Sequence, residues 1–548
     1  RSNVAPYQIG GLNNMIGKSL WSSDPAFSGY IDDFRIYNRA LSPKEILDLA
    51  DAPLMIGDSM SKQVKQFNVV FDQTNNTIYL PVKLGTDITN FDPEFAVADG
   101  VEISPSTPQD FSKGPVKYTV TKDGQSREYT VTVSVDNNPV LEGYYADPEI
   151  LYYDGKFYIY PTTDGYASWS GRSFSVFSSE DLVNWKHETV ILDLPKDTVW
   201  STGNAWAPCI IEKDGKFYFY FSANVNGGAK AVGVAVADSP TGPFVDSGKP
   251  LVNVSPTGGG QQIDPDVFHD PVSGKYYLYW GNGYMAVAEL ADDMVSLVPG
   301  TTKVITPQNA AYREAPYVFY RNGKYYFLWS QDDTGSPNYQ VRYGVSDSPT
   351  GPIVGNYQIL FRDDSNWIYG PAHNSVLQIP GTDEWYIVYH RISRPDGYKQ
   401  IDPGVYNFGP GNHREVCIDR MYFDENGNIL PITPTLKGVD PFVVNTISYR
   451  SVSSLSSGAE IIVDIEFPKG SIKTDTAVAI ICVYDNDNKL ISVKTQQLEG
   501  LIGEDTVTKT ITYTAPEEVK AGYKFKLFLL DQFINLKPLA IPFTLNAE

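Results

Sequence analysis

The segment Asp154-Gly-Lys-Phe-Tyr-Ile-Tyr160 decides the fold, because four variants of it follow along the chain. The variants are Asp214-Gly-Lys-Phe-Tyr-Phe-Tyr220, Ser273-Gly-Lys-Tyr-Tyr-Leu-Tyr279, Asn322-Gly-Lys-Tyr-Tyr-Phe-Leu328 and Thr382-Asp-Glu-Trp-Tyr-Ile-Val388. The five copies begin 60, 59, 49 and 60 residues apart. A tight turn such as Asp-Gly or Asn-Gly before a run of aromatic and β-branched residues is typical of a β-hairpin. The chain therefore contains a five-fold repeat of hairpins.

A third strand follows the hairpin in each of the first four units. These strands lie at residues 174–181, 232–238, 286–290 and 341–347. The hexapeptide Asp-Ser-Pro-Thr-Gly-Pro begins at both Asp238 and Asp347, at the same place in two units, which supports the register of the repeat. Four-stranded units at this spacing are typical of β-propeller blades. We predict a five-bladed β-propeller over residues 138–443.

The composition agrees with an all-β protein. Tyr, Phe and Trp number 37, 26 and 9, and 45 Gly and 38 Pro supply turns. The net charge of −22 disfavours partners such as nucleic acid or anionic membrane surfaces. The longest apolar run, Ala477–Val483, is far shorter than the ~20 residues that span a bilayer. Three widely spaced cysteines, Cys209, Cys417 and Cys482, indicate neither a disulfide framework nor a thiolate zinc site.

The flanking segments predict accessory modules. Residues 51–137 and 444–548 alternate polar and apolar side chains, which predicts a β-sandwich on each side of the propeller. The first of these resembles a bacterial Ig-like module. Residues 1–50 end in a capped helix start, Ser42-Pro-Lys-Glu45, and resemble the closing part of a laminin-G or concanavalin-like jelly roll, most of which is missing.

Equivalent positions of the blades converge on the propeller axis, so the repeat also identifies candidate site residues. Counting back ten residues from Phe157, Phe217 and Tyr325, or twelve from Tyr276 and Trp385, gives the axial position of each blade. These positions hold Asp147, Ala207, Asp264, Ala315 with Glu314 beside it, and His373. Crowded carboxylates repel one another, so a purely structural site would rarely keep three of them. Paired carboxyls, one protonated and one ionised, suit cleavage of a glycosidic bond.

Residues 138–443 resemble glycoside hydrolase family 43 over the whole propeller. The motifs are Tyr145-Ala-Asp-Pro-Glu-Ile150, Asp181-Leu-Val-Asn-Trp185, Trp206-Ala-Pro208, Ile263-Asp-Pro265, Arg313-Glu-Ala-Pro316, Gly370-Pro-Ala-His-Asn-Ser375 and His413-Arg-Glu-Val-Cys-Ile-Asp419. The resemblance implies an inverting hydrolase in which Asp147 is the general base, Glu314 is the general acid, and Asp264 raises the pKa of the acid and orients it. Inversion requires the base and acid to lie roughly 6.5–9.5 Å apart. Asp266 is a rival for Asp264, which the Ile-Asp-Pro context favours.

Five further residues are candidates for ligand contact. Trp169 and Trp206 belong either to the core or to a sugar pocket, where aromatic rings stack on sugar faces, and Ile263 is placed with them. Arg414 either closes the propeller by a salt bridge or, as the resemblance implies, reaches substrate hydroxyls. His373 is either a hydrogen-bonded core histidine or a contact to the calcium ion that the resemblance places under the active site; no organic cofactor is expected.

The resemblance implies an extracellular enzyme, secreted or associated with the cell surface, that acts on plant cell-wall polysaccharide. It would act on chain ends and release terminal α-L-arabinofuranose or β-D-xylose from hemicellulose or pectin. An endo-α-1,5-L-arabinanase with an open cleft is one alternative. A non-catalytic carbohydrate-binding propeller is another, and the presence of all three acids argues against it. The accessory modules are expected to anchor the enzyme on polysaccharide.

Overall fold

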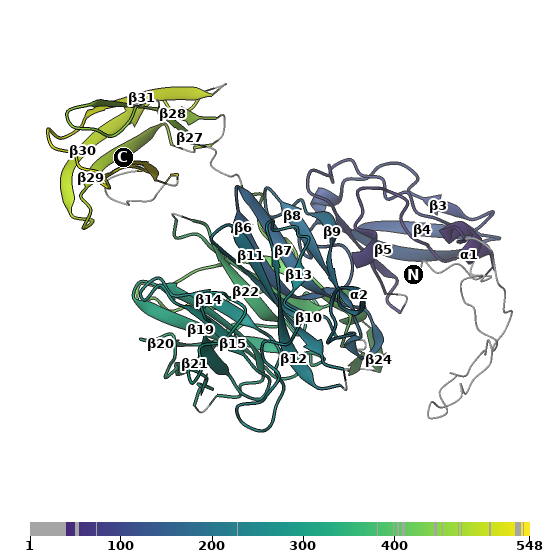
Figure 1. Ribbon diagram of the computed structural model, residues 1–548. Helices are drawn as coiled ribbons and strands as arrows, with labels where there is room; N and C mark the ends of the chain where they lie inside the picture. The colour runs from purple at the N-terminus through teal and green to yellow at the C-terminus, as the bar shows by residue number, and fades with distance from the viewer. Residues whose placement is uncertain are drawn as a thin grey trace. The chain divides into compact units, whose positions relative to one another are not determined.

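The computed structural model describes most of the chain after residue 39 (Figure 1). The described residues are 40–49, 54–72, 74–226, 228–308, 310–380, 382–397, 399–402, 405–407, 411–442, 447–451, 453–468, 471–472, 474–503, 506–531, 539–540 and 542–547. The chain divides into two units, and the boundary between them lies between Val135 and Asp136. Within the described residues, no helix has the length and apolar character needed to cross a membrane.

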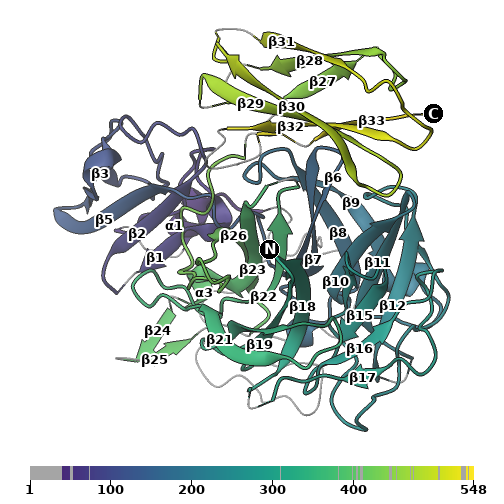
Figure 2. The same ribbon diagram turned by 90° about the vertical axis from the view of Figure 1, so that its left-hand side faces the viewer.

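Five antiparallel sheets form the propeller, and their strands are labelled in Figures 1 and 2. Blade 1 contains β6 (Tyr145–Tyr153), β7 (Lys156–Thr163), β8 (Ser173–Ser179) and β9 (Lys186–Asp193). Blade 2 contains β10 (Trp206–Lys213), β11 (Lys216–Asn224), β12 (Lys230–Ala237) and β13 (Val245–Asp246). Blade 3 contains β14 (Asp266–His269), β15 (Tyr276–Trp280), β16 (Ala286–Glu289) and β17 (Lys303–Val304).

Blade 4 contains β18 (Glu314–Arg321), β19 (Lys324–Gln331), β20 (Gln340–Ser346) and β21 (Val354–Leu360). Blade 5 contains β22 (Ala372–Gln378), β23 (Trp385–Ile392) and β26 (Arg414–Met421), and β24 (Lys399–Asp402) pairs with β25 (Val405–Asn407) in a separate ribbon. Three short helical turns connect strands of the propeller: η4 (Ala167–Trp169), α2 (Leu194–Asp197) and α3 (Arg394–Gly397). The predicted hairpins are thus the first two strands of each blade.

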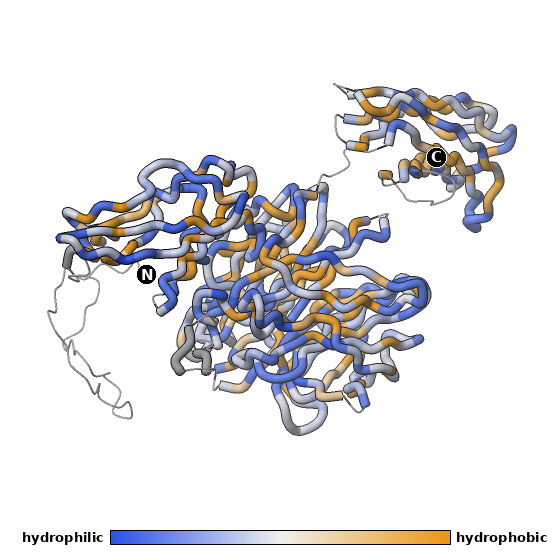
Figure 3. The backbone as a smooth tube through the Cα atoms, turned by 180° about the vertical axis from the view of Figure 1, so that it is seen from behind, coloured by the Kyte–Doolittle hydropathy of each residue, from blue (hydrophilic) through white to orange (hydrophobic). Residues whose placement is uncertain are grey.

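Aromatic and aliphatic side chains hold neighbouring blades together. Five buried clusters join blades 1 and 2, 2 and 3, 3 and 4, 4 and 5, and 5 and 1, so that the ring is closed by packing. Apolar segments correspondingly gather in the interior of the propeller (Figure 3). The start of the propeller also bonds to the last blade, where Val140 N–H donates to the carbonyl oxygen of Val416 at 2.8 Å. The five-bladed propeller predicted from the repeat is confirmed.

The first unit is built on one five-stranded sheet, beside which residues 57–60 pair with residues 94–96. Its strands β1 (Val70–Asp72), β2 (Thr77–Val82), β3 (Glu102–Ser104), β4 (Val116–Lys122) and β5 (Gln125–Val135) form one sheet in the order β1-β2-β5-β4-β3, with β2 and β5 parallel. Loop residues such as Ile56, Phe91 and Phe111, the last in η3 (Phe111–Lys113), pack with the apolar face of this sheet. Alternation in a sequence reveals a half-buried sheet but not whether loops or a second sheet cover it.

The helix predicted before this sheet is present as α1 (Pro43–Leu49), and η2 (Gln66–Asn68) follows it. Ser42 N–H donates to Glu45 Oε2 at 2.8 Å and Glu45 N–H to Ser42 Oγ at 3.3 Å, which is the predicted capping box. The rest of the predicted jelly-roll remnant lies outside the described residues.

The C-terminal segment contains the predicted two-sheet sandwich. One sheet comprises β27 (Ser448–Ser451), β28 (Glu460–Phe467) and β31 (Val507–Thr514). The other comprises β30 (Leu490–Glu499), β29 (Thr476–Tyr484), β32 (Lys524–Leu530) and β33 (Phe543–Asn546). Buried side chains of both sheets share one core.

Candidate active site

The first strand of each blade, or the residues just before it, carries the same backbone distortion at the predicted axial position. The φ angles of Asp147, Ala207, Asp264, Ala315 and His373 are +47°, +42°, +59°, +58° and +46°. Non-glycine residues adopt such angles rarely, and a β-bulge is a common way to redirect a side chain beside an active site. The strand register shifts next to the axial residue in blades 1, 2, 4 and 5. The spacing of the repeat therefore located five structurally equivalent residues.

Side chains of the preceding blade accept the N–H group of each distorted residue. In four blades the acceptor stands on or near the second strand, two residues after the end of the repeated segment, for example Thr162 after Tyr160. The pairs are Ala207 N–H to Thr162 Oγ1 at 2.7 Å, Asp264 N–H to Ser222 Oγ at 2.8 Å, His373 N–H to Ser330 Oγ at 3.0 Å and Asp147 N–H to His390 Nδ1 at 3.1 Å. These bonds hold the backbone of the site because a buried N–H without a partner is costly.

Blade 3 departs from this pattern and thereby fixes Asp264. Its equivalent second-strand position is Gly281, where a side chain would clash with the Tyr284 carbonyl. The Ala315 N–H instead donates to Asp264 Oδ2 at 3.1 Å. Because Ala315 directly follows Glu314, this bond ties the Asp264 carboxylate to the backbone of the neighbouring acid.

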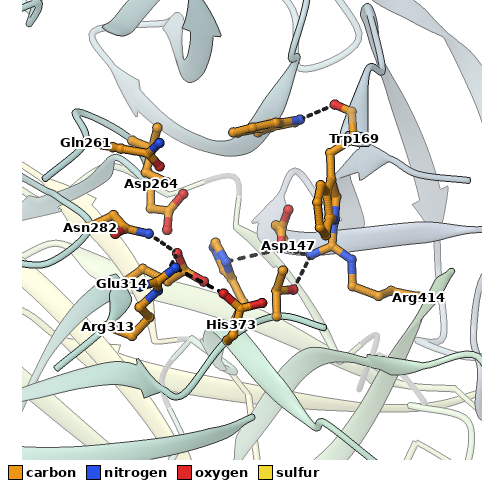
Figure 4. A pocket seen from close by; sticks show the side chains of 13 residues that line it. Asp147, Trp169, Gln261, Asp264, Asn282, Arg313, Glu314, His373 and Arg414 are labelled. Carbon is orange, nitrogen blue, oxygen red and sulfur yellow. Dashed lines mark hydrogen bonds and ion pairs between the residues drawn. The ribbon is translucent and has the colours of Figure 1, made fainter. Parts of the chain in front are cut away.

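Asp147 is buried and surrounded by donors (Figure 4). Thr162 Oγ1 donates to Asp147 Oδ2 at 2.7 Å, and Arg414 Nη1 donates to Asp147 Oδ1 at 2.9 Å. Burial alone would raise the pKa of Asp147, but the Arg414 guanidinium and the neighbouring imidazoles hold that pKa well below its usual range. Asp147 is therefore an ionised carboxylate at neutral pH.

Glu314 lies in the same pocket in a different environment. Tyr339 Oη donates to Glu314 Oε1 at 2.8 Å, and the Asn282 amide donates to Glu314 Oε2. Burial raises the pKa of Glu314, and the Tyr339 bond and the nearby Arg313 offset only part of that rise. One carboxyl of the pocket thus favours the charged form and another the protonated form.

Asp264 and its rival Asp266 differ in their access to the pocket. Asp264 lines the pocket, and burial, together with the Glu314 and Asp147 carboxylates, raises its pKa well above the usual range. Asp266 does not line the pocket; its Oδ2 accepts the Val318 N–H at 2.8 Å, and burial raises its pKa to about 8.

Arg414 forms the predicted salt bridge that closes the propeller and also lies in the pocket, where it could contact substrate. Its Nε donates to Asp164 Oδ2 at 2.7 Å, which joins blade 5 to blade 1, and its Nη1 also donates to Thr334 Oγ1 at 2.9 Å. It nevertheless lines the pocket beside Asp147. The ion pair that closes the propeller therefore also orients the predicted base.

Trp169 and Trp206 form an aromatic wall of the pocket. Trp206 Nε1 donates to the Trp169 carbonyl at 2.6 Å, and Asn204 Nδ2 donates to the same oxygen at 2.9 Å. The Lys230 ammonium nitrogen lies 3.3 Å from the centre of the Trp206 ring. These contacts tie the Trp206 ring to the Trp169 backbone beside the carboxylates, where a sugar face can stack.

His373 lines the pocket, with its Nδ1 3.1 Å from Asp147 Oδ1. The donor set does not fit an ion held by protein side chains. No three His, Cys, Asp or Glu residues come together as metal ligands in the part of the chain that the structure describes. The Arg414 cation also occupies the carboxylate oxygen that His373 faces. A calcium contact by His373 stays a prediction, and no step below depends on it.

One pocket brings together all eight residues predicted for the site. These are Asp147, Trp169, Trp206, Ile263, Asp264, Glu314, His373 and Arg414. Sequence reasoning missed five other lining residues, namely Gln261, Asn282, Arg313, Asp333 and Thr334. It also missed Thr162 and His390, although both stand at the same offset from their hairpins, a signal that the repeat contains.

Family models match three parts of the chain. Residues 137–429 match the model described as glycosyl hydrolases family 43. Residues 59–133 match the model described as SGBP, N-terminal, and residues 2–47 match that of the concanavalin A-like lectin/glucanases superfamily.

Curated relatives and solved structures match the propeller part. The chain is 38% identical over 321 residues to a β-D-galactofuranosidase of Aspergillus niger, which covers 55% of this chain and 86% of the relative. It is 26% identical over 339 residues to a xylosidase/arabinosidase of Bacteroides ovatus, with coverages of 53% and 95%. The crystal structure of a thermostable family-43 glycoside hydrolase matches with 29% identity, a TM-score of 0.47 and coverages of 56% and 98%.

Proposed function

The chain belongs to glycosyl hydrolase family 43 and is a glycoside hydrolase, and from this premise we propose that it releases single terminal sugars with inversion of configuration. The opposite environments of Asp147 and Glu314 within one pocket carry this proposal. An inverting hydrolase needs one ionised and one protonated carboxyl. The neighbours of Asp147 lower its pKa and burial raises that of Glu314, which are the directions that the two roles need.

The proposed reaction is a single displacement. Asp147 takes a proton from a water molecule while the oxygen of that water forms a bond to the anomeric carbon. The bond from the anomeric carbon to the leaving oxygen breaks, and Glu314 gives its proton to that oxygen. Asp264 holds the backbone beside Glu314, and the Glu314 carboxyl in turn raises the pKa of Asp264.

Loop contacts behind the base favour action at chain ends. Gly411 lies directly against Gly335 and the Trp169 ring, and Gly165 N–H donates to the Asn412 carbonyl at 2.7 Å. Loops of blades 1, 4 and 5 therefore meet on the Arg414 side of the pocket. A second sugar beyond the first would have to pass through this contact, so an endo-arabinanase is disfavoured.

The sugar is proposed to be α-L-arabinofuranose or β-D-xylose, from plant hemicellulose or pectin. The name of the Aspergillus niger relative adds β-D-galactofuranose, whose ring matches that of α-L-arabinofuranose except for an exocyclic hydroxymethyl group. Because such polysaccharides are too large to enter cells, we place the enzyme outside the cell or on its surface.

A panel of three nitrophenyl glycosides tests the function: α-L-arabinofuranoside, β-D-xyloside and β-D-galactofuranoside. We expect hydrolysis of at least one by the full chain, and proton NMR of the first-formed sugar should show the inverted anomer. Retention would contradict the base role of Asp147. Turnover of none of the three, or long oligosaccharides as first products from linear arabinan, would contradict the proposed exo activity.

A further inference from the structure

The pocket has two chemically different walls. Trp169 and Arg414 lie on the side of Asp147 (Figure 4). Gln261, Asn282 and Arg313 lie across the pocket, near Asp264 and Glu314, and Asp333 joins them through its ion pair with Arg313. We call Gln261, Asn282, Arg313 and Asp333 the polar wall.

The hydrogen bonds of Glu314 show which of its oxygens faces the polar wall. Oε1 accepts the hydroxyl of Tyr339, a residue that is only 1% exposed. Oε2 accepts the Asn282 amide and lies 3.9 Å from Arg313 Nε. The proton that Glu314 donates is therefore best placed on Oε2, and the leaving oxygen has to approach along the polar wall.

The polar wall also has free capacity to bind hydroxyl groups. Arg313 Nη2 and Asp333 Oδ2 pair at 3.0 Å, with side chains 46% and 57% exposed, so both keep donors or acceptors open to a ligand. The Gln261 side chain is exposed, and among the described residues no hydrogen bond of that side chain is found. An adjacent donor and acceptor match a pair of neighbouring sugar hydroxyls, whereas a nitrophenyl group has no hydroxyl to donate and only weakly accepting nitro oxygens.

We infer that the polar wall binds the first sugar unit of the leaving group. This inference rests on the proposed function, because it takes Glu314 as the acid and Asp147 as the base on the opposite face of the anomeric carbon. The pocket then holds the terminal sugar between the aromatic wall and the carboxylates. Specificity for the linkage is set by Gln261, Arg313 and Asp333.

Leaving-group dependence tests the inference. Arg313→Gln and Gln261→Ala are made in the full chain, and kcat/KM is measured on the best nitrophenyl glycoside of the panel and on a disaccharide or trisaccharide with the same terminal sugar. For Arg313→Gln we expect the loss on the oligosaccharide to exceed the loss on the aryl glycoside about tenfold or more. For Gln261→Ala we expect an excess of about three- to tenfold.

Arg362→Gln is the matched control, since Arg362 is 43% exposed and pairs with Asp364 at 3.2 Å, but lies outside the pocket. It should change neither rate. Equal losses on both substrates would show that Arg313 acts only through the charge of Glu314, and the inference would be wrong; no loss on either would also overturn it. An inactive wild type would instead overturn the proposed function, and the inference with it.

Discussion

Two layers of side chains along the propeller axis contain similar buried acids, but only one of these acids, Asp147, has a lowered pKa. The catalytic layer holds the axial residues Asp147, Ala207, Asp264, Ala315 and His373. The acid layer lies two residues further along each first strand and holds Glu149, Cys209, Asp266, Tyr317 and Ser375. Blades 1 and 3 place a buried carboxyl in both layers.

The difference lies in the donors around each carboxyl. Asp147 accepts hydrogen bonds from Arg414 and Thr162. Cys209 Sγ lies 4.0 Å from both Glu149 Oε1 and Asp266 Oδ1, and within the described residues no Lys, Arg or His lowers the pKa of either acid. Burial raises the pKa of both Glu149 and Asp266, whereas that of Asp147 is lowered. Burial alone therefore yields a neutral acid, and donors are needed to make a base.

The largest expected effect is on kcat, which should fall for substitutions of the catalytic acid and base and change little for substitutions in the acid layer. Asp147→Asn and Glu314→Gln should each lower kcat about 10²- to 10⁴-fold, because each removes a proton-transfer group. Glu149→Gln and Asp266→Asn should keep kcat within about tenfold of wild type, since neither residue lines the pocket. Steady-state kinetics on the best aryl glycoside measures both. Equal losses in the two layers would mean that the acid layer takes part in the chemistry.

A smaller effect is expected from Thr162, whose hydroxyl accepts the Ala207 N–H and therefore turns its own proton toward Asp147. Thr162→Val removes this donor, so the pKa of Asp147 should rise. Activity requires ionised Asp147, so the acidic limb of the kcat/KM profile should move to higher pH, with a loss of activity at acidic pH. Thr162→Ser should restore the wild-type profile.

Ser222→Ala is the matched control for Thr162→Val. Ser222 accepts the Asp264 N–H in the same structural position, so its loss should lower stability similarly by leaving a buried N–H unpaired. Its hydroxyl does not bond to Asp147, so the acidic limb should stay in place. A shift in both variants would mean that the limb reports a general loosening of the propeller.

The repeat predicted the catalytic layer because hairpin register fixes a residue's distance from the axis. Counting from the aromatic hairpins found Asp147, Asp264 and His373, and the shared positive φ explains why counting works across blades with different turns. The partners of these residues were harder to predict. Arg414 is 267 residues from Asp147 in sequence, and only closure of the ring brings the two together.

The polar wall was missed for a different reason. Asn282 and Asp333 stand in loops whose lengths differ between blades, so no equivalent position in another unit points to them. Blade 3 has Gly281 where other blades have the side chain that accepts the next N–H, because a side chain there would clash with Tyr284. The sequence does not show this clash, so it does not predict that Asp264 takes over as the acceptor. The strand order of the first unit could likewise not be predicted, since alternation reports one buried face and not which strands lie side by side.

The smallest expected effect tests the acid layer by stability. The pKa of Asp266 in the folded protein is about 8, above its unfolded value of about 4. Its contribution to stability is therefore complete below about pH 4 and is lost as pH rises toward 8. Asp266→Asn is neutral at every pH, and its amide oxygen can still accept the Val318 N–H. The melting temperature of the variant relative to that of wild type should therefore rise by several degrees between pH 5 and pH 8, given about 2–4 °C per kcal/mol.

Tryptophan fluorescence is the appropriate probe of this melting, because eight of the nine Trp residues lie within residues 138–443. Asp181→Asn serves as a control of opposite sign. Despite partial burial, hydrogen bonds from Asn184 and its neighbours lower the pKa of Asp181, so its charge stabilises the fold above about pH 4. The Asp181 variant should therefore melt below wild type by a constant margin between pH 5 and pH 8. If the melting temperature of the Asp266 variant relative to wild type did not rise, its carboxylate would have a stabilising partner, and the contrast between the layers would be lost.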